Sequence, residues 1–221
     1  MRRLVDFLVE LADNNNREWF VANKQTYLAV QQRFMEFAQQ LVEGVALFDE
    51  SVVGLRLSDC TYRIYRDVRF SHDKSPYKTW YSVFIAPHGK KSGYAGYYLH
   101  IEPSKESFIY AGIHAPTPTL LRSVREEIID HGDIMMRSIE ACKGFELSRF
   151  AVLKRNPKEF SETTPYDELL RMKDLGVIKH LSVEDICRED FLQSLLSDFK
   201  MTQPLVVQLN RAVDYAFEEM M

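Results

Sequence analysis

The chain has 221 residues, of which 46% are hydrophobic and 27% are charged, and its formal net charge at neutral pH is −4. These proportions supply a hydrophobic core and exclude an intrinsically disordered chain, and the length predicts one domain over residues 1–221. The acidic balance excludes a dedicated duplex-DNA binder, because such a protein usually carries a strongly basic surface.

The cysteines and the apolar stretches indicate the compartment. The chain has three cysteines, Cys60, Cys142 and Cys187. They are far apart and include no C-x-x-C pair, so neither a disulfide framework nor a zinc knuckle is predicted. Asp6 and Glu10 interrupt the first apolar run, unlike a signal peptide, and the stretch 107–121 is too short to span a bilayer. We therefore expect a cytoplasmic protein without a membrane segment.

Two helices are predicted at the N-terminal end. An amphipathic helix covers residues 2–12, and a long helix follows from about 16 to 48, with Asn15 as its N-cap and an apolar residue every three or four positions. Asn23 interrupts that apolar stripe. Its amide either holds a neighbouring loop or faces a ligand, since a buried polar group needs a partner.

The hydrophobic period changes from 3.6 to 2 near residue 61. Strands are predicted at 61–70, 80–86, 96–102 and 107–113. The connections after the second and third strands are short, which favours an antiparallel meander. Further along, helices are predicted at 120–131, 133–142, 166–173, 183–199 and 204–221, with a strand at 148–153. The fold class is therefore α+β, an antiparallel sheet at about 61–113 packed against the long N-terminal helix and C-terminal helices.

Positive charge is concentrated around the first predicted strand. Residues 56–91 contain eight basic and three acidic side chains, in a chain whose net charge is negative. Arg66 falls on the apolar face of that strand, so its guanidinium requires a carboxylate, a carbonyl or a bound anion. The segment suits an anionic ligand, or else forms a solvated, salt-bridged edge strand.

Several motifs resemble the conserved hypothetical family called domain of unknown function 2461. They are NNREWF at 15–20, RIYRDVRFS at 63–71, YYLHIEP at 97–103, LKRNPK at 153–158 and ELLRMK at 168–173. The resemblance extends over nearly the whole chain. It departs at His114, where an aromatic residue is expected, and at Thr164, where a histidine is common. The name of the family states no activity, so the resemblance implies no catalytic or binding residue.

The first functional hypothesis is a basic cleft that binds a phosphate-bearing or carboxylate-bearing ligand. The residues predicted to bind it are Asn23, Arg66, Arg69, Lys74, Tyr77 and Lys78. Arginine and lysine side chains would grip the anion, and the amide and phenol would position it. The nine glycines include no Walker loop or dinucleotide fingerprint, so the sequence specifies no cofactor.

Two alternatives remain open. The first is a hydrolase or phosphodiesterase with acid–base candidates Asp67, Asp73, His100 and Glu102. His100 and Glu102 have a spacing that suits two metal ligands, but no metal-binding signature is present and no metal site is predicted. The second is a protein-interaction domain with a solvated charged edge. The sequence indicates no oligomeric state.

Aromatic residues are frequent on the predicted strands. They include Tyr94, Tyr97, Tyr98, Phe108 and Tyr110. Aromatic side chains on strands usually pack in a core, and we predict that role for them. The alternative is a surface on which nucleic-acid bases stack.

Overall fold

The computed structural model describes residues 1–220 and contains an open, antiparallel sheet with helices on one face. The strand order is β1-β2-β3-β5-β4. The strands are β1 (Tyr81–Ile85), β2 (Gly96–Ile101), β3 (Ser107–Ile113), β4 (Glu146–Leu147) and β5 (Leu175–Leu181). The α+β class and the antiparallel meander are confirmed.

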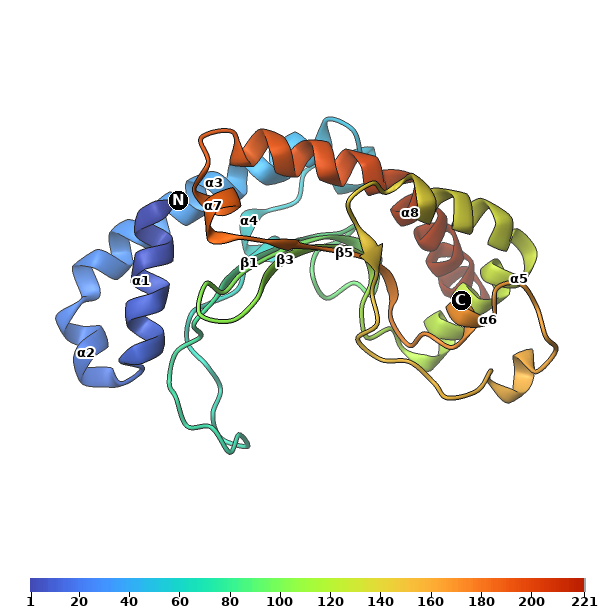
Figure 1. Ribbon diagram of the computed structural model, residues 1–221, viewed down its shortest axis with the longest axis horizontal. Coiled ribbons are helices and arrows are strands. Elements are labelled where there is room, and N and C mark those ends of the chain that lie inside the picture. The colour runs from blue at the N-terminus through green and yellow to red at the C-terminus, as the bar shows by residue number, and fades with distance from the viewer. Residues whose placement is uncertain (221) are drawn as a thin grey trace.

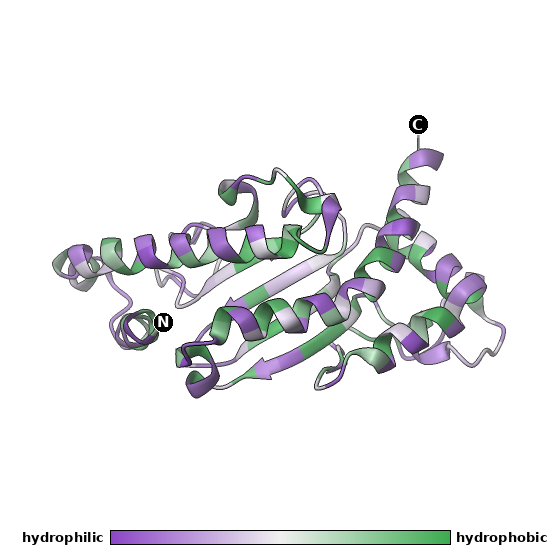
Figure 2. Cartoon of the chain, turned by 90° about the horizontal axis from the view of Figure 1, so that it is seen from above, coloured by the Kyte–Doolittle hydropathy of each residue, from purple (hydrophilic) through white to green (hydrophobic). Residues whose placement is uncertain are grey.

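The helices account for most of the remaining chain. They are α1 (Arg2–Asp13), α2 (Arg17–Ala22), α3 (Lys24–Ala46), α4 (Leu57–Cys60), α5 (Pro118–Ala141), α6 (Asp167–Leu170), α7 (Val183–Cys187) and α8 (Phe191–Glu219), with short 3-10 turns at Glu50–Val52 and Lys158–Phe160. Helices α3 and α8 lie above one face of the sheet, with part of α8 running beside α3 (Figure 1, Figure 2). Within residues 1–220, no helix combines the length and the apolar character that crossing a lipid bilayer requires.

The core lies between the sheet and these helices. On β2, Tyr97, Leu99 and Ile101 are fully buried, whereas Tyr98 and His100 between them are partly exposed. This alternation follows from strand geometry, in which successive side chains point to opposite faces. One face of the sheet is therefore in the core, and the other faces the hollow of an arch (Figure 1).

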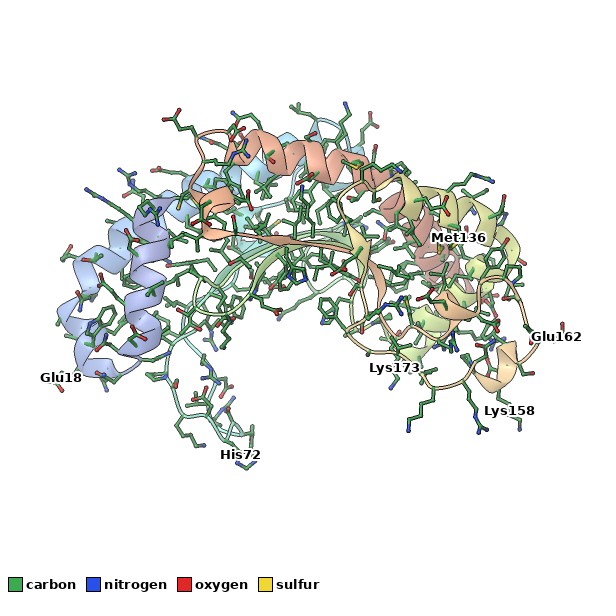
Figure 3. The ribbon with its side chains drawn as sticks, viewed as in Figure 1. Glu18, His72, Met136, Lys158, Glu162 and Lys173 are labelled. Atoms are coloured by element: carbon green, nitrogen blue, oxygen red, sulfur yellow. The ribbon has the colours of Figure 1, made fainter. Side chains whose placement is uncertain are left out.

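The ends of the arch are built from different parts of the chain. One end contains α1, α2 and the loop that hangs beside them, with His72 at its tip (Figure 3). The other end contains α5, α6 and the irregular segment that carries Lys158 and Lys173 (Figure 3). The open face of the sheet thus lies between two groups of projecting side chains.

Residues 61–70 do not form the predicted strand. Thr61 forms an isolated bridge with Val83, and Tyr65 forms another with Tyr77. Between Tyr65 and Tyr77 the chain forms an irregular loop, in which Phe70 is 94% exposed. A strand gains stability from a buried face and a paired neighbour, and most of this segment has neither. The alternation of polar and apolar residues at 61–70 therefore does not correspond to a strand.

The N-terminal and C-terminal helices differ from the prediction in where they begin and divide. The long helix is divided at Asn23 into α2 and α3, and Asn16 rather than Asn15 caps α2 by accepting from the Trp19 N–H. The predicted helix at 183–199 is divided at 188–190 into α7 and α8, and Pro204 lies inside α8 instead of opening a new helix. The predicted break after residue 131 is confirmed as a kink, because His131 has a non-helical backbone within α5.

The predicted elements between residues 148 and 182 are the least accurate. Strand β5 was not predicted, although it pairs with β3 along its whole length. The predicted strand at 148–153 is wrong, since β4 is only Glu146–Leu147 and Val152 forms an isolated bridge. β5 contains Gly176, Lys179 and His180, which weaken its local signal, so its pairing partner determines its conformation.

Candidate functional site

Aromatic side chains cover the open face of the sheet in two cross-strand rows. The register aligns Phe84 with Tyr98, and Tyr98 with Tyr110. The neighbouring row aligns His100 with Phe108. Side chains opposite one another on adjacent strands are close enough to pack together, so the rows form a continuous aromatic floor.

A cavity of about 460 Å³ lies on this floor. Its lining residues are Tyr62, Trp80, Phe84, Lys90, Tyr98, His100, Phe108, Tyr110, His114 and Phe150. The His100 ring stacks on Phe108 with centroids 5.0 Å apart, and Trp80 lies 5.2 Å from His100. The size and the mainly aromatic lining are typical of a site for a small organic molecule.

Two lysines lie near the β1 side of the cavity: Lys90 lines it, and Lys78 packs against the ring of Trp80, which also lines it. The Lys78 Nζ is 4.5 Å from the centroid of Trp80 and 5.4 Å from that of Tyr62, and the Lys90 Nζ is 5.5 Å from the Tyr62 centroid. Burial lowers the pKa of Lys78, and the charge of Arg63 lowers it further. In the described part of the chain none of these three cations forms an ion pair with a carboxylate. The Lys90 ammonium donates to the Ser58 carbonyl, whereas Lys78 is held only against the aromatic rings.

A chain of polar groups extends from the cavity towards the end of β2. The Tyr98 hydroxyl lies 2.9 Å from the His100 Nδ1, and the His100 Nε2 lies 3.3 Å from a carboxylate oxygen of Glu102. Lys105 donates to the other oxygen of Glu102 at 3.0 Å, and Thr79 also donates to it. The groups alternate as donors and acceptors, so the chain can relay a proton change between the cavity and Glu102.

The environment of this chain sets its charge state. Burial raises the pKa of Tyr98 to about 12. Burial also lowers the pKa of His100, although the hydrogen bond to Glu102 acts in the opposite direction. For Glu102, burial disfavours the carboxylate, but hydrogen bonds from Thr79, Lys105 and His100 outweigh it and lower the pKa. At neutral pH the site therefore holds a neutral phenol, a neutral imidazole and a carboxylate.

We expect stability to fall as the pH is lowered through the titration range of His100. Its pKa is lower in the folded protein than the usual value of about 6.5, so the unfolded chain binds the proton more readily. The contribution of neutral His100 to the free energy of unfolding is fully present at pH values above its usual pKa. It is lost as the pH falls towards the pKa of His100 in the folded protein. Urea unfolding at pH 7.5 and 5.5 should show a smaller pH effect in His100→Gln than in the wild type. An equal effect in both proteins would contradict the assignment.

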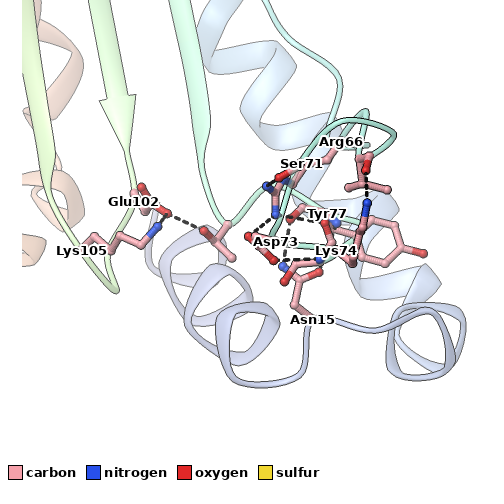
Figure 4. A network of polar contacts seen from close by, with 11 residues as sticks. Asn15, Arg66, Ser71, Asp73, Lys74, Tyr77, Glu102 and Lys105 are labelled. Carbon is pink, nitrogen blue, oxygen red and sulfur yellow. Dashed lines mark hydrogen bonds and ion pairs between the residues drawn. The ribbon is translucent and has the colours of Figure 1, made fainter.

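Arg66, predicted to bind the ligand, organises the projecting loop instead. It donates to Asp73, to the Ser75 carbonyl at 3.1 Å and to the Ser71 hydroxyl at 3.4 Å (Figure 4). The requirement for a carboxylate and a carbonyl partner is confirmed, but the guanidinium lies in an irregular loop and not on a strand face. Its side chain remains 25% exposed. Hydrogen bonds from Ser75 and Arg66 hold the pKa of Asp73 well below its usual range.

The other predicted residues of this loop are also paired locally. Arg69 forms a two-point ion pair with Asp67, in which the Arg69 Nε lies 3.0 Å from the Asp67 Oδ1. The Lys74 ammonium donates to the Val68 carbonyl at 3.0 Å (Figure 4). None of the predicted ligand-binding residues Arg66, Arg69 and Lys74 lines the aromatic cavity.

Asn23 and Tyr77 have structural contacts. The Asn23 amide donates to the Trp19 carbonyl at the junction of α2 and α3. The Tyr77 ring stacks on Phe20 with centroids 3.8 Å apart, and its backbone N–H and carbonyl both bond to the side chain of Asn15 (Figure 4). Of the predicted residues, only His100 lines the cavity, while Lys78 lies against the Trp80 ring and Glu102 is hydrogen-bonded to His100.

Sequence reasoning missed most of the cavity. It assigned the strand aromatics to the core, which is correct for Tyr97 but not for Tyr98 or Phe108, whose rings line the open cavity. Period-two alternation on β2 predicts that Tyr97 and Tyr98 point to opposite faces of the sheet. It does not predict which of the two faces remains uncovered. Among residues 1–220, no three His, Cys, Asp or Glu side chains are grouped so that they could hold a metal ion.

Comparison with known proteins gives one result. A family model described as "Conserved hypothetical protein (DUF2461)" matches residues 3–207. No curated protein and no solved structure gives a significant match to the chain.

Proposed function

Because the chain belongs to the DUF2461 family of conserved hypothetical proteins, whose description states no activity, we propose a function from the site itself. The protein binds a small ligand that has a flat aromatic body and an anionic group, as a nucleotide has. The observation that carries this proposal is an aromatic cavity beside two lysines that form no ion pair within residues 1–220.

The aromatic floor supports the flat part of the ligand. Trp80, His100 and Phe108 present adjacent rings to a cavity of about 460 Å³. A planar ring that stacks on such side chains gains roughly 1–3 kcal/mol per base, and the interaction tolerates different bases. An aliphatic ligand would bury area there but would lack the stacking geometry.

The lysines support the anionic part. Lys78 and Lys90 lie over the rings of Tyr62 and Trp80, so their charges are held at one side of the floor. A partly desolvated ammonium gains more from an anion than one in free solvent, because the local dielectric constant is lower. The predicted anionic ligand is therefore retained, but its site moves from the projecting loop to the cavity.

Tryptophan fluorescence tests the proposal. The chain has two tryptophans, and Trp19→Phe leaves Trp80 as the single reporter in the cavity. We expect AMP to quench its emission saturably and adenosine to bind about tenfold more weakly, which corresponds to about 1.4 kcal/mol for the phosphate.

A lysine pair provides the control for the same measurement. Lys78→Met should remove most of the preference for AMP over adenosine, whereas Lys200→Met, at an exposed position on α8, should leave it unchanged. If no nucleotide quenches Trp80 saturably, the cavity does not bind ligands of this class.

The polar chain at the cavity supports a second candidate, a hydrolase or phosphodiesterase that uses His100 and Glu102 for acid–base catalysis. Asp67 and Asp73 do not support it, because both are exposed and paired with arginines. Hydrolysis of bis(p-nitrophenyl) phosphate is the test, and His100→Gln should abolish it. Equal rates in the variant and the wild type would eliminate this candidate.

A further inference from the structure

We infer that the ligand of the aromatic cavity is part of a longer molecule, a single-stranded nucleic acid that runs across the open face of the sheet. This inference rests on the proposed function, since it uses the same aromatic floor. It adds that the two ends of the arch contact the strand beyond the cavity. Three observations carry it.

The first is the extent of the aromatic surface. Ring contacts run from Tyr62 through Trp80 to His100, with centroids 6.0 and 5.2 Å apart. They continue from Phe108 to Phe150, 6.1 Å away, on the segment beyond β4. The rings thus cross β1, β2 and β3 and extend past them, which offers stacking positions for successive bases. A mononucleotide would use only one of them.

The second is the distribution of charge around the open face. On one side the segment 56–91 has a charge of +5, from eight basic and three acidic residues, although the whole chain has −4. On the other side, Lys158 and Lys173 both lie at the end of the arch opposite the loop that carries His72 (Figure 3). Neither of these lysines forms an ion pair within residues 1–220. Cations on both sides of a stacking surface suit a chain of phosphates that enters and leaves it.

The third is Phe70, in the loop that hangs beside the open face. It is 94% exposed, and the Arg69 guanidinium carbon lies 5.9 Å from its ring centroid. It does not line the aromatic cavity, so a ligand confined there gains nothing from it. An aromatic side chain beside an arginine can stack on a base that lies outside the cavity.

The cations do not favour duplex DNA. The proposed stacking positions are the faces of the aromatic side chains. The bases of a duplex are stacked on one another and cannot reach these faces. A single strand presents its bases freely, so the same surface discriminates by strandedness and not by sequence.

Fluorescence anisotropy with labelled oligonucleotides tests the inference. The probes are oligothymidylates of 3, 6 and 12 nucleotides and a 12-base-pair duplex, with dTMP as a competitor, at 50 and 200 mM salt. We expect the 6-mer to bind at least tenfold more tightly than dTMP. We also expect its affinity to fall steeply with salt and the duplex to bind more weakly than the 12-mer.

Phe70→Ala should weaken binding of the 12-mer about tenfold while leaving dTMP binding and the melting temperature unchanged. Leu47→Ala is the matched control, because Leu47 is 89% exposed at the end of α3, on the helix-covered side. If oligonucleotides bind no more tightly than dTMP, or if the duplex binds as well as the single strand, the inference is wrong and the proposed function stands. If neither dTMP nor oligonucleotides bind, both are wrong.

Discussion

Replacing Phe199 by alanine is expected to lower the free energy of unfolding by about 3–5 kcal/mol. Phe199 lies on α8 and is 0% exposed, and its ring centroid is 5.4 Å from that of Tyr97 on β2. The side chain thus fills the space between the covering helix and the sheet. Its removal loses the transfer free energy of the ring and leaves a cavity that the surrounding helices and strands can close only partly.

Urea unfolding followed by circular dichroism measures this effect. Phe199→Leu keeps most of the volume and should cost about 1 kcal/mol. Phe70→Ala removes the same ring from an exposed position and should change the free energy of unfolding by less than about 0.5 kcal/mol. Similar losses in Phe199→Ala and Phe70→Ala would show that α8 does not pack on the sheet as described.

Gly176→Ala is expected to destabilise the fold by about 3 kcal/mol and to disturb the aromatic cavity. A Cβ at this position would lie 2.4 Å from the Ala111 carbonyl oxygen and 2.6 Å from both the Cζ and the hydroxyl oxygen of Tyr110. The Tyr110 ring is fixed on its other side, because its hydroxyl donates to the Ile113 carbonyl at 2.8 Å. The clash is with a backbone atom, so a change of rotamer cannot relieve it, and β3 and β5 must separate.

Gly54→Ala is the control for this substitution. Gly54 has a φ of +81° but no heavy atom within 4 Å of the added Cβ, so its cost is only conformational, about 1 kcal/mol. Thermal unfolding gives the two stabilities, and near-ultraviolet circular dichroism reports the packing of the cavity aromatics. Equal losses at both positions would contradict the close approach of β3 and β5.

The projecting loop and the cavity differ in how their charges are used. Arg66 and Arg69 have carboxylate partners in Asp73 and Asp67, so these charges largely satisfy one another. Lys78 has no carboxylate partner in the described chain and is held against aromatic rings. A count of charges along the sequence cannot separate the two cases, because pairing depends on the loop conformation.

Elements whose stability is mostly local could be predicted from the amino-acid pattern alone. Period-two alternation located β1, β2 and β3 to within one residue at every end. The kink of α5 was also predicted from a local break in the pattern, at His131. Caps, turn residues and hydrophobic period act over a few positions, so they can be recognised without knowledge of the rest of the chain.

Which face of the sheet stays open, and which distant segments meet there, depends on long-range packing. β5 becomes a strand because β3 offers it a paired edge, and 61–70 does not because most of it lacks one. The alternation at Tyr97 and Tyr98 predicts that their side chains lie on opposite faces of the sheet. The same pattern would be seen if the helices covered the face that carries Tyr98. The position of α3 and α8 assigns Tyr97 to the core and Tyr98 to the cavity, because covering a face depends on contacts between residues far apart in sequence.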